Sequence, residues 1–508
     1  MSEGMNPIIW ADFPDVDVIR VEDTYYMAST TMHMMPGGAI LRSFDLIHWE
    51  LASYLFEALD HTCGQMLQNG EHIYGKGMWA PSLRYNNGKF YALFCAWDTK
   101  KTYLYVAGRA EGPWERRTVD GFYHDASLLF DDGRIFIAYG NSDIYLTELM
   151  DDLSAPKPGG LNRLLVSERQ NVSLGYEGSH LYKIGGRYFL FLIHWLKDGH
   201  CRRTEACFAS DSLLGEFQGG DVLDDDMGYH NAGVAQGGIV DTKDGEWYAM
   251  LFQDHGAVGR IPVLVPVHWK DGFPVFWAGG RVPLNLCVKS TKPEHVYAPL
   301  YGSDDFTSLK NFWQWNHEPV NGCWSVTERP GYLRLYTDRL VQNVANAVNT
   351  LTQRTAGPVC EASVLLDGTG LREGDYAGLC VLQSHYGCIA LTKKAGRFHI
   401  VMLKQGAYPD DGLPRRLDND QTPAREVSCM EVESPVVEVR VCCDFRDSVD
   451  QAKFYYKHGG EWALQGTILQ MHYLLDHFCG ARFGLFAYST VAAGGCADFG
   501  RFDYRVIG

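Results

Sequence analysis

Three acidic residues precede the same kind of segment at three places in the first half of the chain. Asp15 stands before VDVIRV, Asp125 before ASLLFDDG and Glu177 before GSHLYKIGG. Two carboxyl groups held on either side of a bond, one protonated and one ionised, can serve as general acid and general base. Hydrolysis of a glycosidic bond needs such a pair. These residues therefore suit acid–base hydrolysis, provided that the fold brings them together.

Five segments, three of which follow these acids, share one pattern: an apolar run, a polar turn that usually contains Gly, and an aromatic-rich run. This pattern is typical of a β-hairpin. The turns are spaced by roughly 45 to 65 residues, close to the period of four-stranded propeller blades. The five segments are VIRVEDTYYMAS from Val18, SLRYNNGKFYALF from Ser82, SLLFDDGRIFIAYG from Ser127, HLYKIGGRYFLFL from His180 and GIVDTKDGEWYAMLF from Gly238. They predict a five-bladed β-propeller over residues 1–283.

The innermost strands of a propeller converge on one axis, so the residue just before the first strand of each blade faces a central pocket. The second and fifth blades place Trp79 and Gln236 at this position. The ring of Trp79 suits the apolar C–H face of a sugar, and core packing between blades is an equally good interpretation. Asp17, two residues after Asp15, is the alternative candidate for a base.

The composition changes between residues 271 and 294, where Pro, Gly and Lys cluster and the repeat stops. We assign residues 284–300 to a linker. Strand-like runs with irregular spacing follow, and they predict an antiparallel β-sandwich over residues 301–508. Because the linker mixes apolar residues with Pro and is not Gly/Ser-rich, we expect the two domains to pack rigidly. No segment has sustained helical periodicity, so the whole chain is predicted to be all-β.

Charge and composition exclude several classes of partner. The net charge is −17 and no basic run occurs, which disfavours nucleic acid because phosphate binding depends on Lys and Arg. No stretch reaches the roughly 18 apolar residues of a membrane span, and the N-terminus lacks a signal-peptide pattern. We therefore expect a cytoplasmic protein without a membrane partner. The sequence leaves open whether the chain forms a homo-oligomer. The 14 Cys show no zinc-ligand spacing, so no metal site is predicted.

The three acidic motifs together resemble glycoside hydrolase family 43. The resemblance extends to the second domain, because the stretch from Asp304, DDFTSLKNFWQWNHEPVNGCWSVTERPGYLRLYT, is similar to the opening of the jelly-roll, concanavalin-like sandwich of β-xylosidase-like members. It implies that Asp15 is the general base, Glu177 the general acid, and Asp125 the residue that tunes and orients the acid. The Pro that usually follows each motif Asp is replaced by Val16 and Ala126.

Further substrate-binding candidates come from the same resemblance. Arg260 matches a position beside the sugar and the carboxylates, with a structural ion pair as the alternative. His255, in the same loop, suits either a substrate hydrogen bond or a purely structural one. His33 lies in TTMHMMPGG, where relatives have a substrate-facing aromatic loop. No cofactor is required. Whether a structural calcium ion is bound is left open. Some relatives hold one through a His on the last blade, whereas this chain has Gln236 there.

The resemblance implies an inverting, exo-acting enzyme that removes terminal xylose or arabinofuranose from xylo-oligosaccharides or arabinoxylo-oligosaccharides. A β-D-xylosidase is favoured over an α-L-arabinofuranosidase, because a cytoplasmic location suits imported fragments of xylan degradation and the sandwich resembles that of exo-acting xylosidases. A carbohydrate-binding propeller without catalysis is the alternative of another class. Binding alone does not need a base on one side of the ligand and an acid on the other.

Overall fold

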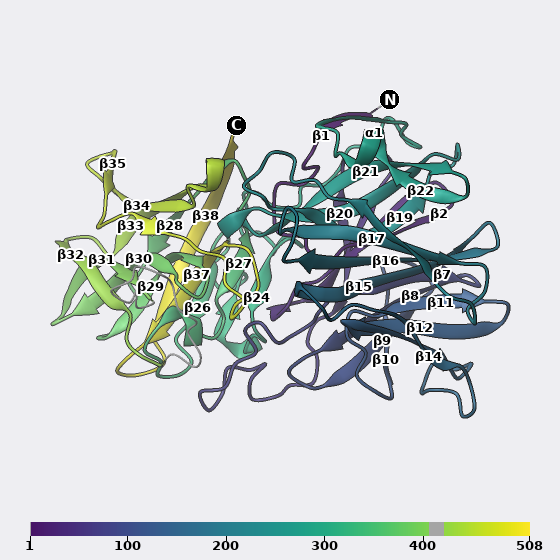
Figure 1. The fold of residues 1–508 in the computed structure, drawn as a ribbon. Coiled ribbons are helices and arrows are strands. Elements are labelled where there is room, and N and C mark those ends of the chain that lie inside the picture. Colours follow the sequence, from purple (N-terminus) through teal and green to yellow (C-terminus); the bar gives the residue numbers. More distant parts are fainter. Residues whose placement is uncertain (1, 406–420) are drawn as a thin grey trace.

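The computed structural model describes residues 2–405 and 421–508, and it consists almost entirely of β-strands (Figure 1). Two bodies lie side by side, a propeller formed by the first half of the chain and a sandwich formed by the second. A single turn of α-helix, α1 (Trp277–Gly280), follows the last blade. Among the described residues, no helix is long and apolar enough to cross a membrane.

Five four-stranded antiparallel sheets form the blades, which confirms the predicted five-bladed propeller. Each blade has its strands in chain order from the axis outward. The blades are β2 (Asp17–Val21), β3 (Thr24–Ser29), β5 (Gly37–Ser43) and β6 (Glu50–Phe56); β7 (Ser82–Asn86), β8 (Lys89–Ala96), β9 (Lys101–Ala107) and β10 (Glu115–Val119); β11 (Ser127–Asp131), β12 (Arg134–Asn141), β13 (Asp143–Leu149) and β14 (Asn162–Ser167); β15 (Val172–Ile184), β16 (Arg187–Leu196), β17 (Arg203–Ser210) and β18 (Gln218–Leu223); and β19 (Val234–Asp241), β20 (Trp247–Asp254), β21 (Arg260–Lys270) and β22 (Phe273–Phe276).

Tight turns of the predicted type join the first two strands of several blades. Asn87-Gly88, Asp132-Gly133 and Gly185-Gly186 all have positive φ, between 47° and 87°. Two-residue hairpins with positive φ at both positions match the natural twist of the strands, and Asn, Asp and Gly tolerate that conformation best. The first strands then close into a ring, since β2 contacts β7, β7 contacts β11, β11 contacts β15, β15 contacts β19, and β19 contacts β2.

A buried ion pair ties the first strands together inside this ring. Arg84 Nη1 lies 2.6 Å from Asp17 Oδ2, and both side chains are buried. The same guanidinium donates to the Leu128 carbonyl (2.8 Å) and to Ser127 Oγ (2.7 Å) of the third blade. On the fourth blade, His180 Nδ1 lies 3.2 Å from Asp17 Oδ1. One carboxylate and one guanidinium thus connect four blades.

Asp17 is therefore not the alternative base that the sequence allowed. Burial raises its pKa, but the positive charge of Arg84 and the contact with His180 outweigh burial and lower the pKa to about 2. A carboxylate this weakly basic, fully buried and already paired, cannot take a proton from water near neutral pH. Its role is structural.

Two larger sheets form the sandwich. One runs β32 (Arg425–Val432), β31 (Arg397–Lys404), β30 (Gly387–Lys394), β29 (Asp375–Leu382), β37 (Arg482–Ser489), β27 (Leu351–Arg354), β24 (Gln314–Asn316) and β4 (Met34–Met35). The other runs β25 (Trp324–Ser325), β26 (Leu333–Tyr336), β38 (Cys496–Ile507), β28 (Val359–Asp367), β33 (Val436–Asp444), β34 (Gln451–His458) and β35 (Glu461–Leu464), with β36 (Leu469–Gln470) beside β34. Buried apolar side chains of both sheets form one core.

The two domains share a sheet. β4 belongs to the propeller half of the sequence, yet it pairs with β24 of the sandwich, with Met35 opposite Trp315. The assigned linker is also tied down, because β23 (Asn285–Val288) pairs with β1 (Ser2–Met5) at the N-terminus. Arg354 of the sandwich donates to the Asp12 carbonyl at 2.6 Å. The two domains are thus joined by a shared sheet and by hydrogen bonds.

Replacing Asp17 by Asn should destabilise the propeller by about 3 to 5 kcal/mol, because removing one partner of a buried pair leaves the other charge uncompensated. Urea-induced unfolding of both proteins measures this difference. Since folding lowers the pKa of Asp17 to about 2, the carboxylate contributes stability above its unfolded pKa of about 3.9, and loses it as the pH falls through about 2. The difference should therefore persist from pH 8 to pH 5.

Asp23→Asn is the matched control. Asp23 pairs with Lys243 at 2.8 Å, but its side chain is 47% exposed, and exposed pairs contribute only about 0 to 1 kcal/mol. Equal losses in the two variants would contradict a special role for the axial pair.

Candidate active site

One pocket at the propeller axis contains six of the eight residues that the sequence singled out. The carboxylates Asp15, Asp125 and Glu177 line it. Trp79, Gln236 and Arg260 complete this set, and further lining comes from Met32, Ala80, Leu174, Ile193, Arg203, Phe252 and Phe478. The equivalent positions in the repeat do converge, although the carboxylates are far apart in the sequence.

An unusual backbone conformation turns these side chains towards the axis. Asp15, Asp125 and Gln236 all have left-handed φ, at 52°, 45° and 60°. Non-glycine residues adopt this region at a cost, and such strain collects at functional sites. In the fourth blade the positive φ falls on Gly178, so Glu177 reaches the pocket one residue earlier. A Cβ on Gly178 would lie 2.7 Å from Gln236 Cγ, so this position needs glycine.

Asp15 is paired with a buried guanidinium. Arg260 Nη1 lies 2.5 Å from Asp15 Oδ1. Burial raises the pKa of Asp15, and the charge and hydrogen bond of Arg260 offset only part of this rise. Arg260 Nε and Nη2 are buried and have no hydrogen-bond partner among the described residues. The ion pair of the structural interpretation is present, and the role of Arg260 in substrate binding stays a prediction.

Glu177 has two side chains with nitrogen atoms beside its carboxyl group. Asn141 Nδ2 donates to Glu177 Oε2 at 2.5 Å, and His124 Nε2 lies 3.4 Å from the same oxygen. His124 is also 3.6 Å from Asp125 Oδ2. Neither Asn141 nor His124 was predicted from the sequence. The position of His124 next to a motif Asp was the available signal, whereas nothing local marked Asn141.

Asp125 and His124 have strongly altered proton affinities. Burial raises the pKa of Asp125 to about 7, with His124 opposing this rise and Glu177 adding to it. Burial lowers the pKa of His124, but Asp125 and the contacts with Cys95 and Glu177 raise it overall to about 11. Near neutral pH His124 is therefore an imidazolium, and Asp125 exchanges between its charged and neutral forms.

Aromatic rings wall the pocket. Trp79 stacks on Trp97 at 5.2 Å between ring centroids, and its buried Nε1 has no partner among the described residues. Phe478 meets the Trp79 ring edge-on at 5.8 Å and lies 4.5 Å from the Arg260 guanidinium. Phe478 comes from the sandwich, in the loop before β37. The same loop is held to the propeller by Gly480 N, which donates to Asp12 Oδ2 at 2.9 Å.

The two remaining predicted residues, His33 and His255, do not line the pocket. His33 is fully buried and contacts the rings of Tyr74, His317 and His477. It lies in the shared-sheet region because β4 turns this segment towards the sandwich. Its neighbour Met32 reaches the pocket instead.

His255 has a structural environment. Its ring stacks on Tyr229 at 3.7 Å, and its Nε2 lies 2.7 Å from Gln253 Oε1. Of the two interpretations of His255, these contacts fit the structural one.

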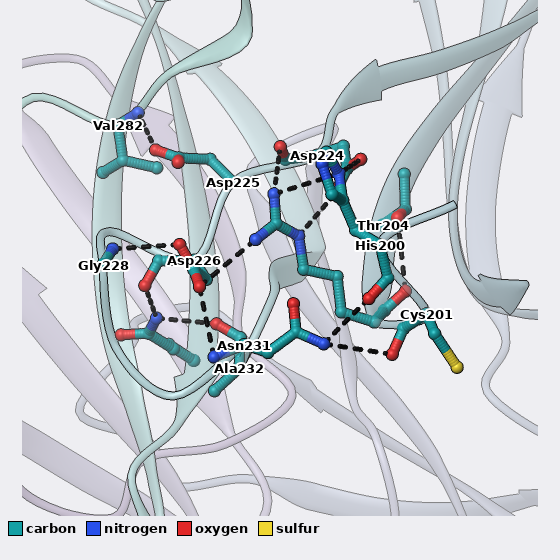
Figure 2. Close-up of polar contacts among 12 residues, drawn as sticks. His200, Cys201, Thr204, Asp224, Asp225, Asp226, Gly228, Asn231, Ala232 and Val282 are labelled. Atoms are coloured by element: carbon teal, nitrogen blue, oxygen red, sulfur yellow. Dashed lines mark hydrogen bonds and ion pairs between the residues drawn. The ribbon is translucent and has the colours of Figure 1, made fainter. Parts of the chain in front are cut away.

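The loop that carries Tyr229 contains three consecutive acids, Asp224 to Asp226, and Figure 2 shows that the chain itself uses them. Asp226 accepts hydrogen bonds from the backbone N–H groups of Gly228 (3.0 Å) and Asn231 (3.1 Å). Asp225 accepts one from Val282 N at 2.7 Å. Asp224 pairs with Arg202 at 2.5 Å. This acidic cluster therefore stabilises the loop, and it offers no free set of ligands for a cation.

Among the described residues, one group of three has the spacing of a metal site: His124, Asp125 and Glu177, with ligand atoms within 4.8 Å of one another. Calcium prefers roughly 6 to 8 oxygen ligands, whereas this group offers two carboxylates and one imidazole nitrogen. Deeper on the axis, the Arg84 guanidinium already neutralises Asp17. Neither donor set fits a resident calcium ion.

A five-bladed propeller with carboxylates at its axis, joined to a β-sandwich, is the arrangement that the sequence predicted for a glycoside hydrolase. The chain belongs to glycosyl hydrolases family 43, whose family model matches residues 5–274. Residues 303–505 match the β-xylosidase C-terminal concanavalin A-like domain. The family resemblance and the type of the second domain are thereby confirmed.

Individual relatives agree with this assignment. A β-xylosidase of Formosa agariphila is 30% identical over 438 residues, which cover 74% of this chain and 72% of that protein. A non-reducing end α-L-arabinofuranosidase of Bacteroides ovatus is 28% identical over 429 residues, covering 79% and 78%. The solved structure of a bifunctional GH43-CE protein of Bacteroides eggerthii is 42% identical with a TM-score of 0.91, and it covers 99% of this chain. This chain spans 64% of the length of that protein.

Truncating Phe478 to Ala should lower kcat/KM on the order of ten- to a hundredfold, because the Arg260 side chain that holds Asp15 would lose its packing and water would enter the pocket. Steady-state kinetics on an aryl glycoside measures the loss. Leu475→Ala is the matched control, since Leu475 belongs to the same loop but is 64% exposed. An unaltered Phe478→Ala enzyme would show that the sandwich does not contribute to the pocket.

Proposed function

We propose that this chain is an exo-acting β-D-xylosidase that removes terminal xylose from xylo-oligosaccharides with inversion of the anomeric centre. One observation carries the proposal: Asp15, Asp125 and Glu177 line a single pocket, with a guanidinium on Asp15 and hydrogen-bond donors on Glu177. The two sides of the pocket therefore differ in charge and bonding, as an acid and a base require.

In this proposal Asp15 is the general base. The adjacent Arg260 favours its ionised form, while the pKa raised by burial makes the carboxylate a stronger base than an exposed Asp. Glu177 protonates the leaving oxygen on the opposite face. The two carboxyl groups of an inverting enzyme are separated by roughly 6.5 to 9.5 Å, which leaves room for the attacking water.

Asp125 acts through Glu177. Their nearest carboxylate oxygens lie within 4.8 Å, close enough for the charge of one group to act on the other. With a pKa of about 7, Asp125 changes its charge in the pH range where the enzyme is proposed to work. In this proposal its change of charge makes the activity depend on pH near neutrality.

The shape of the pocket supports exo action on one terminal sugar. Asp15 and Asp125 are each only 6% exposed, and Trp79 and Phe478 wall the space above them. Xylosidase activity is favoured by the match to a β-xylosidase-type second domain and by the Formosa agariphila relative. An α-L-arabinofuranosidase is the second candidate, since the Bacteroides ovatus relative is nearly as similar and matches a larger share of the chain.

The sugar is tested with p-nitrophenyl β-D-xylopyranoside and p-nitrophenyl α-L-arabinofuranoside. We expect a higher kcat/KM on the xyloside, and NMR of the first product should show α-xylose, the inverted anomer. A preference for the arabinofuranoside would make the second candidate the function, and a β-xylose product would rule out inversion. Asp15→Asn is the control for contaminating glycosidases, because its loss should not depend on the leaving group.

The roles of the two carboxylates are tested by varying the leaving group. Glu177→Gln should lose about 10² to 10⁴-fold on unactivated xylobiose, the range of general acid catalysis. On a dinitrophenyl xyloside it should lose much less, because that leaving group departs without a proton. Asp15→Asn should lose similarly on both substrates, and azide should restore turnover because it needs no deprotonation. The opposite pattern would reverse the roles.

A further inference from the structure

The two hydrogen-bond donors at Glu177 reach the same oxygen atom. Asn141 Nδ2 lies 2.5 Å from Oε2, and His124 Nε2 lies 3.4 Å from Oε2. No side chain of the described residues donates to Oε1. The carboxyl group, which lines the pocket, is thus bonded to the protein at one oxygen and free at the other.

The amide of Asn141 has a fixed orientation. Ser142 Oγ donates to Asn141 Oδ1 at 3.1 Å, so the amide oxygen is used as an acceptor and the NH₂ group faces Glu177. The backbone holds this turn next to the acid, because Ser142 N donates to the Tyr176 carbonyl at 2.7 Å. Asn141 is the last residue of β12 and Glu177 lies within β15. A neighbouring blade therefore supplies the first donor to Oε2.

His124 is fixed from the same turn. Gly140 N, one residue before Asn141, donates to the His124 carbonyl at 3.0 Å. The imidazole ring lies between Asp125 Oδ2 at 3.6 Å and Glu177 Oε2 at 3.4 Å, with the ring of Trp79 edge-on at 5.4 Å.

The charge of His124 follows from its surroundings. The titratable groups around it are Asp125, Glu177 and Cys95, and together they keep it protonated near neutral pH despite its burial. A protonated imidazole can donate from both nitrogens. His124 Nε2 therefore serves as a donor to Oε2 whichever tautomer a neutral ring would adopt.

We propose that Asn141 and His124 are positioning residues that hold Glu177 Oε2 as an acceptor, so that the proton given to the leaving group resides on Oε1. This inference rests on the proposed role of Glu177 as the acid. In the reaction the O–H bond at Oε1 breaks and its electron pair stays on the carboxylate. The proton bonds to the glycosidic oxygen, which keeps the electrons of the broken C–O bond.

The arrangement also stabilises the product state of that transfer. When Glu177 loses its proton, negative charge spreads onto Oε2, where an amide N–H and an imidazolium N–H are already aimed. Donors placed in advance at the site of developing charge stabilise the transition state without reorganisation. Because His124 carries a full positive charge, it contributes electrostatically as well as through its hydrogen bond.

The test compares Asn141→Ala and His124→Phe on two substrates. Both should lose about ten- to a hundredfold in kcat/KM on xylobiose, a part of the 10² to 10⁴-fold range of general acid catalysis. On a dinitrophenyl xyloside each should lose less than about threefold, since that leaving group needs little protonation. Asn162→Ala is the matched control, because Asn162 is an exposed Asn of the same blade. It should behave like the wild type on both substrates.

The pH profile separates the charge of His124 from its hydrogen bond. The charge of His124 opposes the rise in the pKa of Asp125. Removing this cation should raise that pKa further, so the alkaline limb of kcat/KM should move to higher pH in His124→Phe. His124→Gln keeps a neutral donor and loses the charge. It should recover most of the loss on xylobiose while keeping the shifted alkaline limb. A purely structural role would leave that limb in place.

Asn141→Asp is the control for misfolding, because it preserves the shape of the side chain and replaces the amide donor with an acceptor. It should lose more on xylobiose than Asn141→Ala does. The inference is wrong if the Asn141 and His124 variants each lose as much on the dinitrophenyl xyloside as on xylobiose while Glu177→Gln is still rescued by the dinitrophenyl leaving group. That outcome would leave the proposed function intact. If Glu177→Gln loses as much on the dinitrophenyl xyloside as on xylobiose, the proposed role of Glu177 is wrong.

Discussion

The closed ring of first strands depends on the buried pair of Asp17 and Arg84. The Arg84 guanidinium bonds to a carboxylate of the first blade and to a carbonyl and a hydroxyl of the third, so it fixes the spacing between blades at the axis. The pocket lies where these strands begin, and Asp15 is only two residues from Asp17. A change in the ring would therefore move the catalytic candidates relative to one another, and small displacements are costly in acid–base catalysis.

Above this pair, the pocket separates its charges into two sides. Asp15 faces the Arg260 guanidinium, whereas Glu177 faces the Asn141 amide and the His124 imidazolium. Three carboxylates in one buried space would repel one another strongly in a low dielectric. The cations Arg260 and His124 reduce that repulsion, and so does a proton on Asp125, whose pKa is about 7. The proposed base and the proposed acid therefore have different neighbours: a guanidinium beside Asp15, and an amide and an imidazole beside Glu177.

The sandwich is part of the active site and not an appendage. Its first sheet includes β4 from the propeller half of the chain, and its Phe478 lines the pocket. Asp12 joins the two domains at this point, because its carboxylate accepts from Arg260 N and from Gly480 N. Since Arg260 in turn holds Asp15, the placement of the proposed base depends on contacts from both domains.

The sequence alone determined the blades, because a hairpin is a local structure: alternating strands and Asn-Gly or Asp-Gly turns specify it within about a dozen residues. The repeat then placed Asp15, Asp125, Glu177, Trp79 and Gln236 at the axis without any tertiary information. Only the tertiary structure decided which neighbours these residues have. Phe478 and Asn141 carry no local signal, and His33 turned away because β4 pairs with a strand about 280 residues later. Contacts between distant segments follow from packing of whole domains, which no local pattern encodes.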